Sequence, residues 1–256
     1  MSRSGKLVRA ARELGQALDH LEFGAPVTHV YNPLGYAWRA HETYLRTWGG
    51  NSKRVVFLGM NPGPFGMVQT GVPFGEIGAV RDWLRIETPV GKPRVEHPKR
   101  PVEGFACQRS EVSGRRLWGL FAEQFGAARN FFADHFVLNY CPLAFFDAAG
   151  RNLTPDKLRA SETAALFDLC DRHLRSVVEI LNPEWLIGVG DFAERRARLV
   201  LPQFAIHEAK RGDRPSPASS VKIGKILHPS PASPAANRDW AKQAAEQLRL
   251  MRIWKP

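Results

Sequence analysis

Four short apolar runs alternate with longer amphipathic segments along the chain. The runs lie at 55–59, 136–140, 185–189 and 223–228, and their apolar character is mostly uninterrupted. A strand that is apolar on both faces is typical of a parallel sheet covered by helices. In a sheet with one face exposed to solvent, apolar and polar residues alternate along each strand. The pattern therefore predicts a parallel sheet of four strands.

Helical periodicity fills the intervals between these runs. Apolar positions three and four residues apart predict four helices, at 113–125, 155–181, 191–199 and 235–251. The second of these, 155–181, is expected to be interrupted once. Thr154 is a suitable N-cap, and the proline that follows it is favourable at the first helical position. The segments 87–112 and 207–222 are predicted to be irregular. Alternation of strands and helices predicts a doubly wound α/β sandwich.

Composition places the chain among globular proteins. It has 256 residues, of which 44% are hydrophobic, and one core of this size is plausible. We expect a single domain over 1–256, with a helical extension over about residues 1–50. No apolar run approaches the roughly 20 residues that cross a bilayer, and residues 1–18 are too charged for a secretory signal. We expect a cytoplasmic protein with no membrane partner, nucleoid-associated in a bacterium or nuclear in a eukaryote.

Charge and cysteine content narrow the possible partners and cofactors. The 36 Lys and Arg exceed the 25 Asp and Glu, which gives a net charge of +11. Such an excess suits a polyanion such as DNA, although solvated arginines would also produce it. Cys107, Cys141 and Cys170 form no CxxC pair and are too few for an iron–sulfur cluster or an all-cysteine zinc site. We expect buried thiols, no metal and no cofactor.

Polar side chains follow three of the predicted strands. Asn61 comes shortly after the first, Asn139 lies near the end of the second, and His228 ends the fourth. Ligands of doubly wound sheets bind beyond the carboxyl ends of the strands. We therefore expect these three side chains to converge at one edge of the sheet.

Two loops at that edge have unusual composition. The segment 59–76 is rich in glycine and proline yet apolar, which suits a stiff wall around a flat ligand; alternatively, Asn61 is a turn residue in a tight connection. The proline-spaced segment 228–237 could meet phosphates and press small apolar residues into a base stack. Alternatively, it is a polyproline connector that begins at a buried histidine.

A third segment suggests a different function. Gly188, Val189 and Gly190 begin a stretch that follows a strand, opens a helix and fits a relaxed GxGxxA dinucleotide fingerprint. A dinucleotide-dependent oxidoreductase is therefore one alternative. Close packing of helix on strand is a simpler explanation for the two glycines.

Segments 59–67 and 71–76, together with 228–231 and 235–237, resemble the single-strand-selective monofunctional uracil-DNA glycosylase family. Shorter similarities occur at 96–101, 110–114 and 150–155. The resemblance implies the uracil-DNA glycosylase fold, a three-layer α/β/α sandwich around a four-stranded parallel sheet. It also implies a repair enzyme that hydrolyses the N-glycosidic bond of uracil, or of related bases such as 5-hydroxymethyluracil, and leaves an abasic site in DNA.

The resemblance also assigns the chemistry to two side chains. Asn61 would position the attacking water; because an amide is a poor base, the step would depend on a sugar cation that has already formed. His228 would face O2 of the base and, as a neutral imidazole, stabilise the developing anion. A DNA-binding protein without catalytic activity is a further alternative, but binding alone requires neither residue.

Four residues are expected to recognise the flipped base. The carbonyl of Asn139 can accept from N3–H of uracil while its NH₂ donates to O4, and cytosine presents the reversed pattern. Phe74 is the family's stacking platform, and Met60 and Gly63 offer backbone near C5.

The remaining candidates would contact DNA. Lys99, Arg100 and Arg238 are candidate phosphate contacts. The loop that would fill the vacated base stack contributes a larger set, namely Pro229, Ser230, Pro231, Ala232, Ser233, Pro234, Ala235 and Asn237. We expect DNA containing uracil-type lesions, single- or double-stranded, to be the partner of a monomer.

Overall fold

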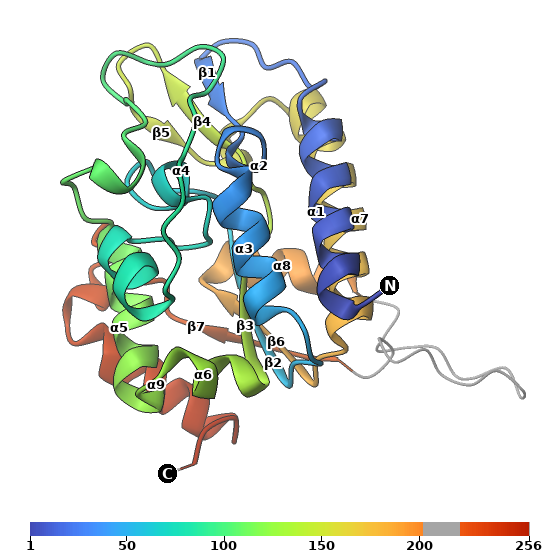
Figure 1. Ribbon diagram of the computed structural model, residues 1–256, viewed down its shortest axis with the longest axis vertical. Helices are drawn as coiled ribbons and strands as arrows, with labels where there is room; N and C mark the ends of the chain where they lie inside the picture. Colours follow the sequence, from blue (N-terminus) through green and yellow to red (C-terminus); the bar gives the residue numbers. More distant parts are fainter. Residues whose placement is uncertain (202–220, 256) are drawn as a thin grey trace, which may run out of the picture.

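The fold is built around a parallel sheet of four strands. The computed structural model describes residues 1–201 and 221–255, and in it strands β2 (Val55–Gly59), β3 (His135–Asn139), β6 (Trp185–Val189) and β7 (Lys222–Ile226) form the sheet (Figure 1). Their order is β3-β2-β6-β7, and every neighbouring pair is parallel. The predicted four-stranded parallel sheet is confirmed, with strand limits within two residues of those expected.

Helices cover the sheet on both sides. In Figure 1, α5 (Val112–Phe125), α6 (Ala128–Asp134) and α9 (Trp240–Leu250) gather on one side, and α1 (Arg3–Leu18), α7 (Ala160–Leu181) and α8 (Asp191–Val200) on the other. Helix α3 (Trp38–Trp48), which follows the single turn α2 (Pro33–Tyr36), reaches strand β3, where the Tyr44 hydroxyl donates to the Val137 carbonyl at 2.8 Å. The predicted three-layer α/β/α sandwich is confirmed.

Two of the predicted helices differ from expectation near their starts. The second is preceded by a separate 3-10 turn at Pro155–Lys157, which is the expected interruption. The last was predicted to begin at Ala235, but Ala235–Asn237 is a 3-10 turn and α9 begins at Trp240. Asp239 has a left-handed backbone with φ of 54° and caps α9 with its side chain. An acidic cap leaves this helix end unsuited to a phosphate.

A second, smaller sheet was not predicted. Strands β1 (Val27–Tyr31), β4 (Ala144–Asp147) and β5 (Asn152–Leu153) pair in antiparallel order β1-β4-β5. The sequence gives little sign of it because β5 has only two residues and β4 only four. This sheet lies beside the carboxyl edge of the main sheet and carries Asn152 to the site described below.

The N-terminal fifty residues are integrated into the fold. They contain α1, α2 and α3 and also strand β1, which pairs with β4. One hydrophobic cluster includes Leu7 of α1 and extends to Trp254. No helix in the described part of the chain is long and apolar enough to cross a membrane. Within the predicted irregular segment 87–112 there is one 3-10 turn, Gly104–Ala106; most of the other, 207–222, lies outside the described residues.

Candidate active site

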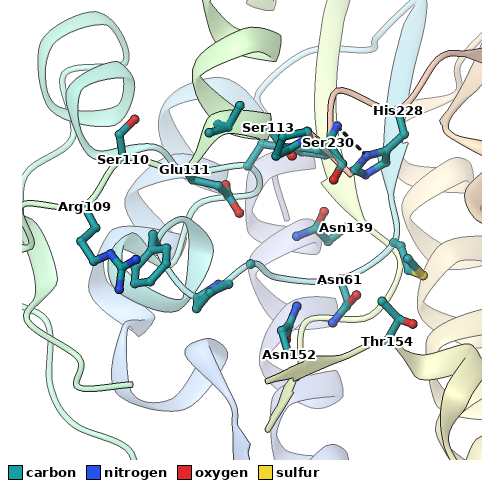
Figure 2. Close-up of a pocket in the computed structure, with 17 residues that line it drawn as sticks. Asn61, Arg109, Ser110, Glu111, Ser113, Asn139, Asn152, Thr154, His228 and Ser230 are labelled. Atoms are coloured by element: carbon teal, nitrogen blue, oxygen red, sulfur yellow. Dashed lines mark hydrogen bonds between the residues drawn. The ribbon is translucent and has the colours of Figure 1, made fainter. Parts of the chain in front are cut away.

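A cavity of about 690 Å³ opens at the carboxyl edge of the main sheet (Figure 2). It holds the three polar side chains expected there, Asn61, Asn139 and His228. The other lining residues come from five segments of the chain: Met60, Gly63, Pro64, Phe65, Phe74, Arg109, Ser110, Glu111, Val112, Ser113, Asn152, Thr154, Ser230 and Pro231. Every residue predicted to catalyse the reaction or to bind the base therefore lines one cavity.

His228 lies two residues beyond β7 and presents a defined hydrogen-bonding face. The Ser230 N–H donates to its Nδ1 at 3.0 Å, which leaves the imidazole proton on Nε2. Burial lowers the pKa of His228 to about 4, so the ring is neutral at pH 7. His228 thus offers the cavity an uncharged N–H donor, and a backbone amide sets the tautomer of its ring.

Asn139 is the last residue of β3, and its amide is held from two sides. Its side chain is 6% exposed, and its Nδ2 donates to the Met67 sulfur at 3.3 Å. Gly59 stands opposite in β2, and a Cβ there would lie 2.5 Å both from the Asn139 Oδ1 and from the Phe74 ring. A glycine at this position gives both side chains room at the end of the strand.

Phe74 has a backbone conformation that is uncommon for an aromatic residue. Its φ is 52°, in the left-handed region, at a cost of roughly 1–3 kcal/mol. The Trp118 indole N–H donates to the Phe74 carbonyl at 3.0 Å and the Glu76 amide to the same oxygen at 2.7 Å. A Cβ on Gly114 would lie 2.1 Å from that carbonyl oxygen. These contacts hold the ring at the cavity wall, 6.4 Å from the His228 ring centre.

Asn61 follows β2 and is only half-buried. Its Nδ2 donates to the Leu143 carbonyl at 3.2 Å. With the nitrogen held in this way, Oδ1 is available as an acceptor towards the cavity. Figure 2 shows Asn61 beneath Asn139, with Asn152 and Thr154 beside it.

The two glycines of the dinucleotide-like segment are accounted for by packing. A Cβ on Gly188 would lie 2.4 Å from the Glu194 amide nitrogen in α8, so this glycine lets the helix approach the strand. A Cβ on Gly190, whose φ is 90°, would lie 2.9 Å from the Cβ of His228. Gly190 therefore makes room for a residue of the cavity described above, and the spacing gives no support to an oxidoreductase.

We call residues 229–238 the proline loop, and its shape depends on a residue outside it. Arg116 of α5 donates from Nη1 to the Pro229 carbonyl at 2.9 Å and from Nη2 to the Asn237 Oδ1 at 3.1 Å. Asn237 in turn donates from Nδ2 to the Pro231 carbonyl at 2.9 Å. Both ends of the Asn237 amide are thus used within the protein. The exposed apolar residues of the loop are Pro231, Ala232, Pro234 and Ala235.

The candidate phosphate contacts lie outside the cavity. Lys99 and Arg238 are exposed. Arg100 is half-buried, donates from Nε to the Gly150 carbonyl at 2.6 Å, and has its guanidinium 5.4 Å from the centre of the Phe65 ring. Arg109, which the sequence did not single out, lies closer to that ring, at 4.1 Å, and lines the cavity itself.

Six polar residues that line the cavity were assigned no role in binding or catalysis from the sequence. Five of them belong to two stretches that resemble the family, 110–114 and 150–155, and the sixth, Arg109, immediately precedes 110–114. The six are Arg109, Ser110, Glu111, Ser113, Asn152 and Thr154. The resemblance of these stretches was the available signal. Hydrophobic periodicity could not reveal them, because they lie at element ends.

Among these residues, Glu111 has a buried carboxyl oxygen without a hydrogen-bond partner in the described chain. It is the N-cap residue of α5 but makes no side-chain capping bond, and within the described chain its Oε2 has no hydrogen-bond partner. A Cβ on Gly63 would lie 2.0 Å from its Oε1, and one on Gly66 2.0 Å from its Oε2. The carboxyl group therefore occupies space that these glycines leave open.

Metal ligands are not gathered at the cavity. Within residues 1–201 and 221–255, no group of three or more His, Cys, Asp or Glu side chains is arranged to hold a metal ion. Cys107, Cys141 and Cys170 are buried and free, as expected of structural thiols. The absence of metal and cofactor from the reaction stays a prediction.

Comparison with known proteins identifies the family. The model of the uracil DNA glycosylase superfamily matches residues 47–249. The chain is 46% identical over 236 residues to the mouse (Mus musculus) single-strand selective monofunctional uracil DNA glycosylase, covering 92% of this chain and 80% of that protein. It is 47% identical over 236 residues to the rat (Rattus norvegicus) single-strand selective monofunctional uracil-DNA glycosylase, with the same coverage. The crystal structure of Pedobacter heparinus SMUG2 shares the fold, with a TM-score of 0.69, 16% identity, and 99% and 98% of the two chains covered.

Proposed function

The chain belongs to the uracil-DNA glycosylase superfamily, and we propose that it excises uracil from DNA as a monofunctional glycosylase. The enzyme hydrolyses the N-glycosidic bond and leaves an abasic site for base excision repair. Related bases with a polar 5-substituent, such as 5-hydroxymethyluracil, are further proposed substrates. The observation that carries the proposal is that Asn61, Asn139 and His228, which are distant in the sequence, line one cavity.

Catalysis begins with extrusion of the nucleotide into the cavity, because the cavity side chains cannot otherwise reach the base and its C1′. The departing base carries negative charge on its oxygens. His228 donates Nε2–H to O2, and as a neutral ring it stabilises this charge without adding a formal positive charge. Ser230 fixes the tautomer that this donation requires.

Asn61 positions the water that adds to the sugar cation. Its Nδ2 is engaged by the Leu143 carbonyl, so Oδ1 is left to accept a hydrogen bond from water. An amide cannot remove a proton efficiently, so bond breaking precedes water attack.

Asn139 and Phe74 select the base. A free amide could rotate and recognise cytosine instead; donation from Nδ2 to the Met67 sulfur favours one orientation. Stacking on Phe74 contributes roughly 1–3 kcal/mol per base and is not specific by itself. Specificity for uracil therefore rests on the polar groups around the ring, with the Met60 and Gly63 backbone near C5.

Contacts with DNA lie around the cavity mouth. We propose that the exposed prolines and alanines of the proline loop fill the vacated stack, held in place by Arg116. Lys99, Arg100 and Arg238 are proposed phosphate contacts. We further propose that the chain acts as a single-domain monomer on single- or double-stranded DNA, in the compartment that holds the genome.

An excision assay tests the proposal. Purified protein is incubated in EDTA with oligonucleotides that carry one uracil, 5-hydroxymethyluracil, xanthine, hypoxanthine or thymine, and alkali then cleaves at abasic sites. We expect strand breaks at uracil and none at thymine, and the Asn61→Ala variant as control should give few. No break at any lesion would refute the enzyme, and loss of activity in EDTA would refute a metal-free reaction.

A further inference from the structure

Glu111 is a half-buried acid in the cavity wall that the mechanism above does not use, and its carboxyl oxygen Oε2 is fully buried. Within the described residues its Oε2 has no partner, although a buried polar oxygen without one costs roughly 1–3 kcal/mol. Three glycines enclose the carboxyl group: a Cβ on Gly63, Gly66 or Gly114 would approach its oxygens to 2.0, 2.0 and 3.0 Å. An unpaired buried carboxyl oxygen destabilises the folded protein, yet three glycines leave space for this carboxyl group. This combination indicates that Glu111 interacts with a bound molecule.

The position of Glu111 along the cavity wall indicates what it would meet. In Figure 2 the side chains of His228, Asn139 and Glu111 follow one another along the wall, and the Glu111 carboxyl group is directed into the cavity on the side of Asn139. Uracil presents O2, N3–H and O4 in the same order along one edge of its ring. With O2 at His228 and N3–H at Asn139, O4 lies towards Glu111.

On the basis of the proposed function, we propose that Glu111 is a specificity-determining residue whose neutral carboxyl group donates a hydrogen bond to O4 of the flipped base. O4 has two lone pairs, and the Asn139 amide uses one of them. A second donor favours uracil over cytosine, whose 4-amino group cannot accept. It also stabilises the departing base, because the anion spreads its charge over O2 and O4.

The protonation state of Glu111 fits this role. Its pKa is raised to about 7, mainly by burial and in addition by the negative charge of Glu76, while the nearby Gly63 amide acts in the opposite direction. The other charged or titratable groups on the surrounding elements are Arg109 on the segment leading to α5, Arg115 and Arg116 in the first turns of α5, and His228 across the cavity; residues 60–70 contain none. Below about pH 7 the group is neutral and can donate, and above it the carboxylate repels O4 and the forming anion.

The pH dependence of kcat/KM on a uracil oligonucleotide tests the proposal. For the wild type we expect kcat/KM to fall above about pH 7, approaching tenfold per pH unit. Glu111→Gln cannot ionise and still offers N–H groups, so its profile should stay flat, with a rate at about pH 6 within roughly fivefold of wild type. Glu111→Ala should be flat and slower by about 10²-fold, as for loss of one donor.

A neighbouring acid provides the matched control. Glu76→Gln removes the charge that raises the Glu111 pKa, so the fall should begin at a lower pH while the rate at about pH 6 is unchanged. If another group in the protein caused the fall in kcat/KM, the pH at which the fall begins would not shift in the Glu76→Gln variant. Circular dichroism of each variant confirms that it is folded.

A modified base tests the contact itself. Sulfur is a weaker acceptor than oxygen, so Glu111→Ala should cost much less on 4-thiouracil than on uracil. Equal losses on both bases, a flat wild-type profile, or a Glu111→Gln variant that keeps the wild-type fall would each overturn the assignment. Wild-type protein that excises no uracil at any pH would overturn the proposed function as well, which separates the two failures.

Discussion

Replacing His228 with alanine removes a single N–H donor from the cavity. With a pKa of about 4, roughly one ring in 10³ is protonated at pH 7, so the side chain contributes a neutral hydrogen bond and no ion pair. Loss of one such donor to a developing oxyanion slows the chemical step by about 10²–10³-fold, or roughly 2.7–4 kcal/mol. Glutamine at this position still offers an N–H group and should recover part of that loss.

Single-turnover excision of uracil from a labelled oligonucleotide measures this effect. Affinity for DNA, from fluorescence anisotropy, should change less than threefold, because the donor acts mainly in the transition state. Between about pH 5 and 7 the wild-type rate should show no rise attributable to His228, since the ring remains neutral throughout. An alanine variant within a few-fold of wild type, or an imidazole pKa near its usual value by NMR, would contradict this role.

Four further predictions concern other parts of the structure. Asn61→Ala should abolish most turnover without weakening DNA binding, as single-turnover rates and anisotropy can show. Gly190→Ala should lower both activity and melting temperature, because the new Cβ would lie 2.9 Å from His228 and φ is 90°; unchanged activity would contradict the packing described. Arg116→Met should raise KM and the Kd for DNA about tenfold with little effect on kcat, since charged hydrogen bonds to the proline loop are lost. Urea unfolding should require less free energy at pH 5 than at pH 7, because four histidines have pKa values lowered to about 4 and charge more readily when unfolded, namely His41, His135, His173 and His228. Each contributes up to about 1.4 kcal/mol per pH unit below about pH 6.5, and the raised pKa of Glu111 offsets part of this loss.

The main sheet was predictable because three of its four strands, β2, β3 and β6, are buried almost throughout, whereas β7 at the edge exposes Lys222 and Lys225. Runs such as 55–59 and 185–189 match their strands residue for residue, since no polar position interrupts them. The convergence of Asn61, Asn139 and His228 followed from parallel topology alone, because it brings all carboxyl ends to one edge.

The features that were missed lack such periodic signals. Strand β5 is two residues long, so no pattern could reveal the small sheet or the placement of Asn152. The start of α9 depends on the left-handed Asp239, which local apolar spacing does not report. Glu111 resembles any acid before a helix in sequence, and its burial arises only when the 60–66 turn folds over it.

The glycines of the dinucleotide-like segment show how spacing can mislead. The same pattern that suits a pyrophosphate also suits a helix packed closely on a strand and a histidine seated beside it. Gly188 and Gly190 serve the second purpose here, as the positions of Glu194 and His228 show. The distinction required tertiary contacts that the sequence does not contain.

A crystal structure of this protein bound to DNA that carries an uncleavable 2′-fluoro-deoxyuridine tests the central claim most directly. We predict the base flipped into the cavity and stacked on Phe74, with O2 at Nε2 of His228, its N3–H at Asn139, and C1′ facing a water held by Asn61. A uracil that remains stacked in the DNA, or that binds away from these side chains, would contradict the account.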